Sequence, residues 1–584
     1  METERVDLVV VGAGLYGITA AITYHKLHPD ARLLVLEASP SIGGPWAPHR
    51  TFPGLKTNNL WGTYQHPDTP MSEERFGVKK GEHVPAEKVH EYLQALIDDN
   101  GIDSLIRLNT KVDTAEKIAG GWKLSCISST GEGKDVQILT NKLILSTGLA
   151  NRPSMPRYAV SPEFQPPIIH SASFPSHYSE IVAPNKHTLI IGAGKSAWDI
   201  AYACATNNGT ATMLIRPTGK GPLWMSPPYV TPFKLWLEKL VFTRFFGLMS
   251  PCPWASNEGF EGVARRFLHG TWLGRKIVTA FWNVLGEDVV SLNRYNEHEE
   301  TKKLRPWRNA FEVGNALSIM NYPTDWFELV REGKIKIIIA DVERVEAENE
   351  AILSTGEKLQ VDAVVSATGW ETHPSIKFLP VGIEKELGLP TKGQVPSAEE
   401  KELMQKAENE LYTRYPFLKE RDSNKLYHPD PSHRNTVKTS GTEGEDHPFR
   451  LYRFMVPPSD LADRSIGFVG AMMTLGSTFC AYLQALWLVA YFDGTLSLPS
   501  TSASEIKYET FLETEYCRMR HAMGYGNKFP DLVFDALPYL DVLMKDLGFE
   551  EKRKGGFKSE YFGSYGPEDY RGLVELYMEK HKLD

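Results

Sequence analysis

The chain has 584 residues, of which 42% are hydrophobic and 23% charged, which predicts a globular protein of two or three domains. Its formal net charge of −9 and the lack of a basic stripe argue against a nucleic-acid partner. The five cysteines include no CxxC pair, which argues against a dithiol or metal-ribbon site and favours a reducing, cytoplasmic compartment. Because an apolar strand pattern already starts at Val6, we expect no cleavable signal peptide.

A dinucleotide-binding pattern opens the chain. The apolar run Val6 to Val11 predicts a buried parallel strand, and a helical pattern follows through Leu27. The turn between them is Gly12-x-Gly14-x-x-Gly17, whose glycines permit a tight turn, a close approach of backbone to a pyrophosphate, and packing of the helix on the strand. The amide groups and the dipole at the helix start are suited to hold phosphates.

An acidic residue completes this pattern. A second apolar run, Leu33 to Leu36, ends on Glu37, 20 residues after Gly17. A carboxylate at that distance accepts hydrogen bonds from ribose hydroxyls and repels a 2′-phosphate. The turn Gly43-Gly44-Pro45-Trp46 follows at once.

The next stretch is a polar loop followed by a predicted helix and strands. In the loop from Thr51 to Pro70, Asn58 and Asn59 either supply amides to a site or hold a left-handed turn. Residues 86–98 predict an amphipathic helix, and residues 106–139 predict short strands. A buried strand over residues 142–146 ends in Thr147-Gly148.

A second dinucleotide-binding pattern begins near residue 188. The strand Thr188 to Ile191 precedes Gly192-x-Gly194-x-Ser196-Ala197 and a helix, with Ala197 in place of the third glycine. The next strand, residues 211–215, ends on Arg216 rather than on an acid. A cation there pairs with a 2′-phosphate, so the site favours NADPH over NADH; the alternative is a solvated surface arginine.

Residues 219–330 are rich in Pro, Trp and Phe and have no clear periodicity, so we expect an irregular insertion that faces a substrate. Its tryptophans suggest a bulky apolar substrate, although tryptophans usually belong to a core; they are Trp224, Trp236, Trp254, Trp272 and Trp282. Residues 233–249 are amphipathic and form either a substrate cover or a membrane-touching helix. We favour the cover.

The rest of the sequence predicts two further strands and then mainly helices. Residues 335–339 and 362–366 predict strands, and the second ends in Ala367-Thr368-Gly369-Trp370. We expect a polar helix over 397–412, a turn-rich, mobile segment over 430–447, and a mixed helical tail over 500–584. Glycines interrupt the apolar segment 466–492, which predicts a buried strand, a turn and a core helix rather than a membrane span.

Over about residues 5–495, these ordered features resemble the class B flavin-dependent monooxygenases, which include flavin-containing monooxygenases, N-hydroxylases and Baeyer–Villiger monooxygenases. The tail and insertions resemble fungal members associated with secondary metabolism. The family's linker motif is Phe-x-Gly-x-x-x-His-x-x-x-aromatic. Here Phe164, His170 and Phe174 match the motif, whereas Pro166 replaces the glycine. Pro175 follows Phe174, and this combination does not distinguish between the subgroups of the family.

Three further positions follow from the resemblance. Asn58 matches a Leu-x-Thr-Asn motif, in which an amide near the flavin helps to hold the oxygenated intermediate. Gln484 matches a helix of the family, in which Tyr482 and Leu486 replace an acid and an arginine. His170 either packs in the linker or has a functional role, and then we expect it to couple the two domains rather than to transfer protons.

The implied fold is α/β, with two Rossmann-like dinucleotide-binding domains, a substrate-facing insertion and a helical C-terminal extension. We expect a FAD-binding domain at 1–155 and 356–499, an NADPH-binding domain at 156–355 that contains the insertion 219–330, and the extension at 500–584. The motifs and the resemblance together imply catalytic roles for Asn58 and His170. They imply no metal, and cofactor contacts for Gly12, Gly14, Gly17, Glu37, Gly44, Trp46, Gly148, Gly192, Gly194, Ser196, Arg216, Thr368, Gly369 and Gln484.

The implied activity is a monooxygenase that uses FAD, NADPH and O₂, forms a flavin hydroperoxide, and inserts one oxygen atom into a bulky apolar secondary metabolite. Three alternatives remain open: a Baeyer–Villiger ketone monooxygenase of the same family, an NADPH-dependent flavin reductase without oxygen insertion, and a flavoprotein scaffold without turnover. The scaffold is disfavoured because it has no use for a second nucleotide site. Membrane contact is not predicted.

Overall fold

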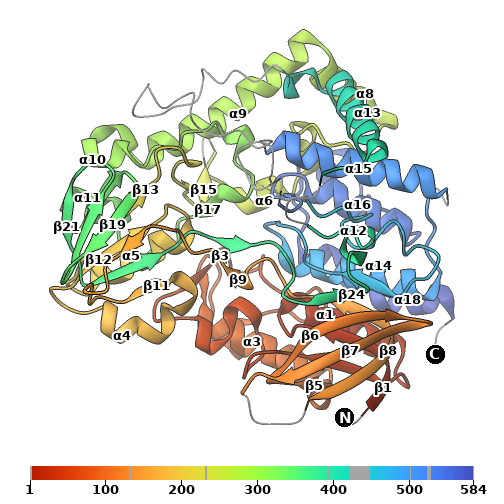
Figure 1. Ribbon diagram of the computed structural model, residues 1–584. Coiled ribbons are helices and arrows are strands. Elements are labelled where there is room, and N and C mark those ends of the chain that lie inside the picture. Colours follow the sequence, from red (N-terminus) through yellow and green to blue (C-terminus); the bar gives the residue numbers. More distant parts are fainter. Residues whose placement is uncertain are drawn as a thin grey trace.

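The computed structural model describes residues 3–130, 135–230, 233–390, 395–419, 448–499, 502–521, 526 and 528–582. A mixed sheet of eight strands and a parallel sheet of five strands form its frame (Figure 1). The segment predicted to be turn-rich, residues 430–447, lies outside the described residues.

The first sheet is built around β1 (Thr3–Val11), whose apolar run is covered on both faces. Its strand order is β24-β6-β7-β8-β1-β2-β5, and β25 pairs with β8. The other strands are β2 (Leu33–Leu36), β5 (Ile106–Arg107), β6 (Thr110–Ile118), β7 (Gly121–Ser128), β8 (Val136–Leu145), β24 (Lys377–Leu379) and β25 (Ile466–Phe468). Helix α1 (Leu15–Leu27) packs against α3 (Ala86–Asp99) and α14 (Ser477–Asp493). The predicted strands and helices of this region are confirmed.

The second sheet has the order β11-β22-β12-β13-β18, with all its pairs parallel. Its strands are β11 (Ile168–His170), β12 (His187–Ile191), β13 (Thr210–Ile215), β18 (Ile335–Ile339) and β22 (Ala363–Ser366). Helix α5 (Lys195–Thr206) packs against β12 and β13. We expected residues from 356 onward to rejoin the first domain, but β22 still belongs to the second sheet, and the chain returns to the first sheet only at β24.

Two linkers connect the sheets, and they pair with each other. Strand β9 (Arg152–Pro153) runs antiparallel to β23 (Trp370–Glu371). Beside them, a small sheet of order β10-β19-β20-β21 extends the second unit. Its strands are β10 (Ala159–Val160), β19 (Val342–Glu346), β20 (Glu350–Leu353) and β21 (Lys358–Gln360).

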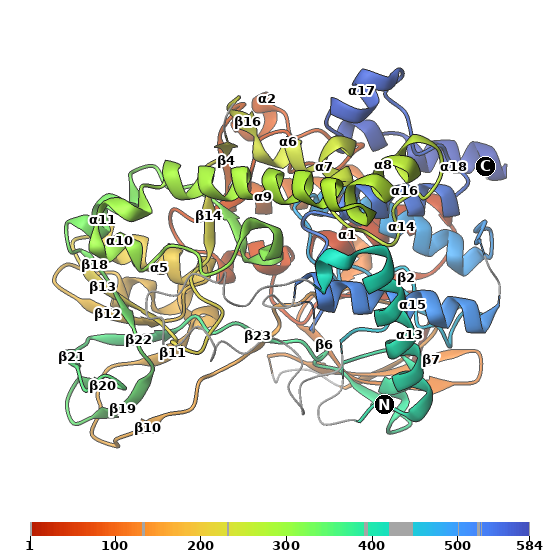
Figure 2. The same cartoon turned by 90° about the horizontal axis from the view of Figure 1, so that it is seen from above.

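The insertion is more regular than we predicted. It contains α8 (Gly259–Gly270) and the 21-residue α9 (Trp272–Leu292), which runs across the molecule in Figure 2. Apolar residues occupy both the buried and the exposed sides of α9, which is why its sequence shows no amphipathic period. The other elements are α6 (Leu237–Val241), α7 (Arg244–Leu248), α10 (Glu299–Lys302), α11 (Trp326–Arg331), β14 (Trp224–Ser226), β15 (Tyr229–Val230), β16 (Leu235–Trp236) and β17 (Leu317–Ile319).

The amphipathic segment 233–249 is not one helix. It forms α6 and α7, and the charged side chains of Glu238 and Arg244 are buried rather than exposed. Among the described residues, we find no helix that is both long and apolar enough to cross a bilayer.

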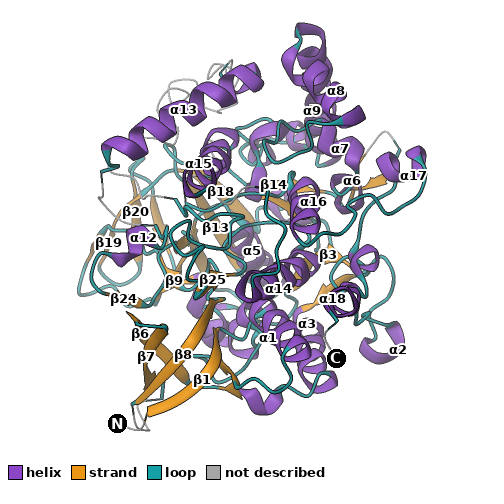
Figure 3. Cartoon of the chain, turned by 90° about the vertical axis from the view of Figure 1, so that its right-hand side faces the viewer, coloured by secondary structure: helices purple, strands orange, loops and turns teal. Residues whose placement is uncertain are grey.

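The C-terminal region surrounds α14. Every residue of α14 from Thr478 to Phe492 is buried, as predicted for a core helix, and α1 and α16 pack against it (Figure 3). The Nε1 of Trp487 donates a hydrogen bond to Asp546 of α16 at 3.0 Å, so the extension is part of the same core. The remaining elements are α2 (Glu73–Phe76), α4 (Tyr178–Ile181), α12 (Ile383–Glu386), α13 (Ala398–Arg414), α15 (Ala503–Arg520), α16 (Ala536–Asp546), α17 (Phe557–Phe562), α18 (Leu573–His581), β3 (Lys56–Leu60) and β4 (His83–Pro85).

Candidate active site

A cavity of about 1090 Å³ lies at the carboxyl ends of β1, β2 and β8. It extends past the loop after β25 to Lys195 and Asp199 of α5, so the helix that packs on the second sheet contributes to its wall. Its volume exceeds the roughly 300–1,000 Å³ of ordinary ligand pockets. A ligand as long as a dinucleotide fits such a space.

The first glycine turn forms one end of this cavity. Gly12 has φ +107°, and a Cβ there would lie 2.5 Å from the carbonyl oxygen of Ser146. A Cβ at Gly17 would overlap the carbonyl oxygen of Gly12, whereas Gly14 lines the cavity. Gly14 is also the N-cap of α1 and has no side chain to satisfy the first amides. Those amides are therefore available to an anion.

Glu37 stands at the carboxyl end of β2 and lines the cavity. Its Oε2 accepts a hydrogen bond from the amide of Ala13 and its Oε1 from the amide of Ser39, both at 2.8 Å. A carboxylate has about four lone-pair sites, so acceptor capacity remains for ribose hydroxyls. The same contacts fix the carboxylate beside the glycine turn.

The opposite wall contains Gly44, Trp46 and Gly148. Gly44 and Gly148 have φ +58° and +66°, and Gly44 faces Gly14 closely enough that a Cβ on Gly44 would lie 3.3 Å from the Gly14 Cα. The Trp46 ring packs edge-on against Tyr64, with centroids 6.3 Å apart. These residues form a narrow slot beside the phosphate-binding turn.

Asn58 and Asn59 lie in strand β3, so the left-handed turn that we left open for them is wrong. Both line the cavity. The Oδ1 of Asn58 accepts a hydrogen bond from Ser318 of β17 at 2.8 Å, which leaves its amide hydrogens as the donating end. Asn59 instead donates to Glu238 at 2.5 Å and to the carbonyl of Leu475 at 3.0 Å.

The sequence analysis did not select Glu238, which lies in the segment 233–249 that we expected to be an amphipathic cover. The carboxylate is buried and accepts from Asn59, from the Leu60 amide at 3.0 Å, from Thr63 at 2.9 Å and from Trp236 Nε1 at 2.9 Å. Burial raises the pKa of Glu238, and these four donors oppose that rise in part. The insertion is thereby tied to the strand that carries Asn58.

The second glycine turn repeats the geometry of the first. Gly192 has φ +129°, and a Cβ there would overlap the Ala367 carbonyl, whereas nothing lies within 4 Å of a Cβ at Gly194. Gly194 is the N-cap of α5, again without a side-chain cap. Gly194, Ser196 and Arg216 are exposed and do not line the large cavity. In the described part of the chain, no ion pair engages Arg216.

Lys195 and Asp199 extend from this turn into the cavity wall. They form an ion pair with each other, and the Tyr322 hydroxyl donates to Asp199 at 2.9 Å. The sequence analysis did not select Lys195, although its position directly after Gly194 was a usable signal. A cation here adds attraction for an anionic ligand between the two turns.

His170 lies in the linker, away from the cavity wall. Its Nδ1 accepts from the Ala172 amide at 3.1 Å, so its Nε2 carries the hydrogen and donates to the Gly369 carbonyl at 3.0 Å. Burial lowers the pKa of His170. Thr368 and Gly369 also bind Ser154 of the other linker, through the Thr368 hydroxyl and the Gly369 carbonyl. His170, Thr368 and Gly369, three of the predicted site residues, therefore help to hold the two linkers together.

Gln484 is fully buried behind the cavity wall. Its Oε1 accepts from the Gly470 amide at 3.0 Å, and its Nε2 donates to the Tyr539 hydroxyl at 2.8 Å. Gly470 lines the cavity, whereas Gln484 does not. The predicted cofactor contact of Gln484 is therefore indirect, through the loop after β25.

The five tryptophans of the insertion do not line the cavity, so the bulky apolar substrate that they suggested stays a prediction. Trp224, Trp254 and Trp282 are buried in the core, as the alternative interpretation had it, and Trp272 is 68% exposed.

Two glycine turns of the same geometry, the first lining the cavity and the second lying next to Lys195 of its wall, define a two-dinucleotide oxidoreductase. Residues 9–237 match the family described as pyridine nucleotide-disulphide oxidoreductase. The FAD-dependent monooxygenase resA of Aspergillus sclerotiorum is 30% identical over 591 residues, with 98% of each chain covered. The FAD-dependent monooxygenase rstn6 of Aspergillus nomiae is 29% identical, also with 98% of each chain covered.

The fold has solved counterparts. Cyclohexanone monooxygenase from Rhodococcus sp. Phi1, solved with NADP⁺, superposes with a TM-score of 0.58 at 16% identity, covering 94% of this chain and 98% of that one. The chain belongs to the FAD-dependent monooxygenases. The α/β fold with Rossmann-like sheets, and an oxidoreductase of the monooxygenase class, are thus confirmed.

Proposed function

We propose that this monooxygenase binds FAD at the first glycine turn and NADPH at the second, and oxygenates a bulky apolar metabolite with O₂. The observation that carries this proposal is the cavity that begins at the first glycine turn and reaches Lys195, the residue directly after Gly194 of the second turn. The five cysteines are free and buried, which is consistent with our proposal that the protein works in the reducing cytoplasm.

The first turn suits FAD for three reasons. Its glycines lie where side chains would collide with backbone, its helix amides are uncapped, and Glu37 is fixed at the cavity wall. Glu37 repels a 2′-phosphate, which FAD lacks. We assign Gly12, Gly14 and Gly17 to the turn, Gly44, Trp46 and Gly148 to the slot beside the ring, and Gln484 to support of Gly470.

The second turn suits NADPH. Gly194 and Ser196 are exposed at the start of α5, and Arg216 is exposed at the end of the neighbouring strand β13, where a 2′-phosphate can pair with it. The cyclohexanone monooxygenase counterpart was solved with NADP⁺ bound, which is consistent with this assignment. A surface arginine without a ligand remains the competing explanation.

When bound, FAD activates O₂ and NADPH supplies the hydride. The chain orients both cofactors and limits the access of water. We propose that the amide of Asn58 donates a hydrogen bond into the cavity, since its Oδ1 is engaged by Ser318. His170 acts by holding the linkers in place, because both of its ring nitrogens already contact the backbone.

The names of the relatives support oxygenation but do not choose its type. Fungal FAD-dependent monooxygenases favour a secondary metabolite, and the fold of a ketone monooxygenase keeps oxygen insertion beside a ketone as the second candidate. The test is incubation of the purified protein with NADPH, ¹⁸O₂ and a ketone or a thioether, followed by mass spectrometry. One labelled oxygen in a product supports the proposal. Hydrogen peroxide equal to the NADPH consumed, with no labelled product from any candidate, supports the flavin reductase instead.

A further inference from the structure

Helix α8 buries charged side chains and exposes large apolar ones. Its charged residues Glu261 and Arg265 are buried, together with His269. Its large apolar residues Phe260 and Val263 are 52% and 60% exposed. A helix that faces water normally shows the opposite arrangement. The outer side of α8 is therefore suited to an apolar environment.

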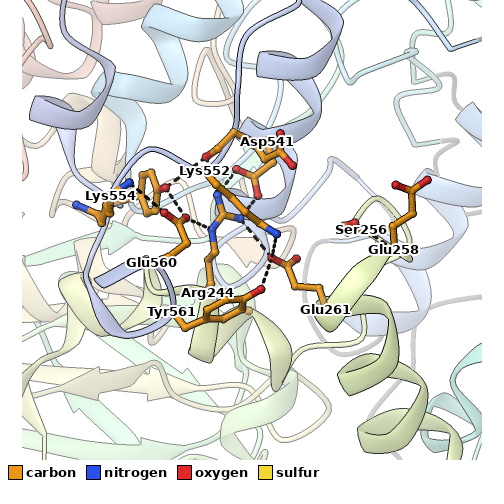
Figure 4. A network of polar contacts seen from close by, with 12 residues as sticks. Arg244, Ser256, Glu258, Glu261, Asp541, Lys552, Lys554, Glu560 and Tyr561 are labelled. Atoms are coloured by element: carbon orange, nitrogen blue, oxygen red, sulfur yellow. Dashed lines mark hydrogen bonds and ion pairs between the residues drawn. The ribbon is translucent and has the colours of Figure 1, made fainter. Parts of the chain in front are cut away.

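Buried polar contacts hold α8 in this orientation (Figure 4). Arg244 of α7 binds Asp541 of α16 and Glu560 of α17, and Glu261 accepts from Lys552 at 3.3 Å. The Tyr561 hydroxyl also donates to Glu261, at 3.3 Å.

The other inward residues are equally fixed. Arg265 donates to the carbonyls of Ser250 and Gly247, and His269 contacts the carbonyl of Leu248. Rotating α8 to expose Glu261 and Arg265 would break the contacts that these two residues and His269 make. The outward display of its apolar residues is thus a stable feature of the fold.

Neighbouring helices continue the same surface. α17 buries its acid, Glu560, and exposes Phe557 and Phe562, and α9 begins with Trp272 at 68% exposure. The Phe260 and Phe557 rings meet edge to face at 5.2 Å, so α8 and α17 share one face. Figure 2 shows both helices at the same side of the molecule. We call this surface the docking face; it comprises Phe260, Val263, Phe267, Trp272, Leu273, Ile277, Phe557 and Phe562.

Exposed basic residues surround the docking face, and the exposed acid Glu258 lies just before α8. Arg266, Lys276 and Lys558 are exposed on α8, α9 and α17, whereas the acids of α8 and α17 point inward. Cations around aromatic and aliphatic side chains are the signature of a helix that lies in a membrane interface.

We propose that the docking face binds the surface of a lipid bilayer that contains anionic headgroups. The apolar side chains enter the headgroup boundary while the cations pair with lipid phosphates. A second copy of the chain fits less well, because a two-fold contact through this face would bring its cations together. The enzyme would then be a peripheral membrane protein that lies close to apolar compounds dissolved in the bilayer.

The test uses purified protein with its flavin bound and co-sedimentation with phosphatidylcholine vesicles, with and without phosphatidylserine. We expect binding that needs phosphatidylserine and weakens with added salt. The variant Val263→Ser/Trp272→Ser should bind at least about tenfold more weakly, and Arg266→Glu/Lys276→Glu likewise, since each cation contributes about fivefold near an anionic surface. Val381→Ser, at a residue 90% exposed outside the docking face, is the matched control and should bind like wild type.

Flavin content and NADPH consumption of each variant without vesicles check that it is folded. Failure of the wild type to bind either vesicle would overturn the proposal. Equal binding by the wild type and both double variants would also overturn it, because another surface would then be responsible. A wild-type dimer in light scattering that Val263→Ser/Trp272→Ser converts to a monomer, without vesicle binding, would assign the face to a second copy instead.

Discussion

Asn59 Nδ2 donates to the buried carboxylate of Glu238 at 2.5 Å, and this contact joins strand β3 of the cofactor cavity to α6 of the insertion. Glu238 has four neutral donors around it, and no cation of the described residues forms an ion pair with it. Removing its charge or its second oxygen therefore leaves donors without an acceptor. Asn58, the neighbour of Asn59, depends on the same strand for its position.

We predict that Glu238→Gln destabilises the protein by about 1–3 kcal/mol, because at least one buried donor loses its acceptor. Displacement of Asn58 should also raise the hydrogen peroxide released per NADPH consumed. Thermal unfolding and a peroxide assay measure the two effects. Glu87→Gln, at an exposed position of α3, is the control and should change neither. A Glu238→Gln enzyme that unfolds at the wild-type temperature and releases no more hydrogen peroxide per NADPH than the wild type would show that the contact is dispensable.

Arg216→Ala should weaken NADPH selectively. Loss of a charge-assisted bond to the 2′-phosphate, about 1.5–3 kcal/mol, corresponds to roughly a 10- to 150-fold increase in KM for NADPH. KM for NADH should stay nearly constant. Steady-state kinetics with both nucleotides give the ratio, and Lys336→Ala on the exposed side of β18 serves as control. An unchanged ratio would mean that Arg216 is a surface arginine.

The two glycine turns should respond differently to alanine. Gly17→Ala places a Cβ against the Gly12 carbonyl, so we expect loss of bound flavin and of folded protein. Gly194→Ala meets no atom within 4 Å, so it should fold and retain flavin while NADPH binds more weakly. Flavin absorbance and nucleotide titration separate the two outcomes. Normal flavin content in Gly17→Ala would contradict the close approach.

His170 should contribute to acid sensitivity but not to catalysis by proton transfer. Because burial lowers its pKa in the folded state, its contribution to stability is complete above the unfolded value of about 6.5 and is lost as the pH falls through the folded pKa. His170→Gln should therefore flatten the fall of the unfolding temperature below about pH 6.5. It should leave the pH profile of flavin reduction unchanged between pH 6.5 and 8. A shift of that profile would assign His170 a proton-transfer role.

Arg244→Met should be strongly destabilising. It leaves the buried carboxylates of Asp541 and Glu560 without their cation, at a cost of about 3–5 kcal/mol. Denaturant unfolding measures the loss. Arg275→Met, on the more exposed α9, is the comparison and should cost much less. Similar costs for both would show that the buried network is not the main anchor of the C-terminal helices.

The parts of the site that depend on local geometry were predictable from sequence. A strand, three spaced glycines, a helix and an acid at fixed distance identify the first turn, and the acid indeed reaches the turn through the Ala13 amide. Glu238 was missed because its partners in and after β3, such as Asn59, lie far away in the sequence. The support that Gln484 gives to Gly470 could not be predicted because it depends on how α14 packs behind the loop after β25. Helix α9 was missed because both its sides are apolar, which removes the periodic signal.

The most direct test of the two-cofactor cavity is anaerobic titration of the purified protein with NADPH, followed by the absorbance of its bound flavin. The account predicts that about one equivalent of NADPH bleaches the flavin band, because one hydride pair reduces one flavin. A protein that carries no flavin, or a flavin band that NADPH leaves unchanged, would contradict it.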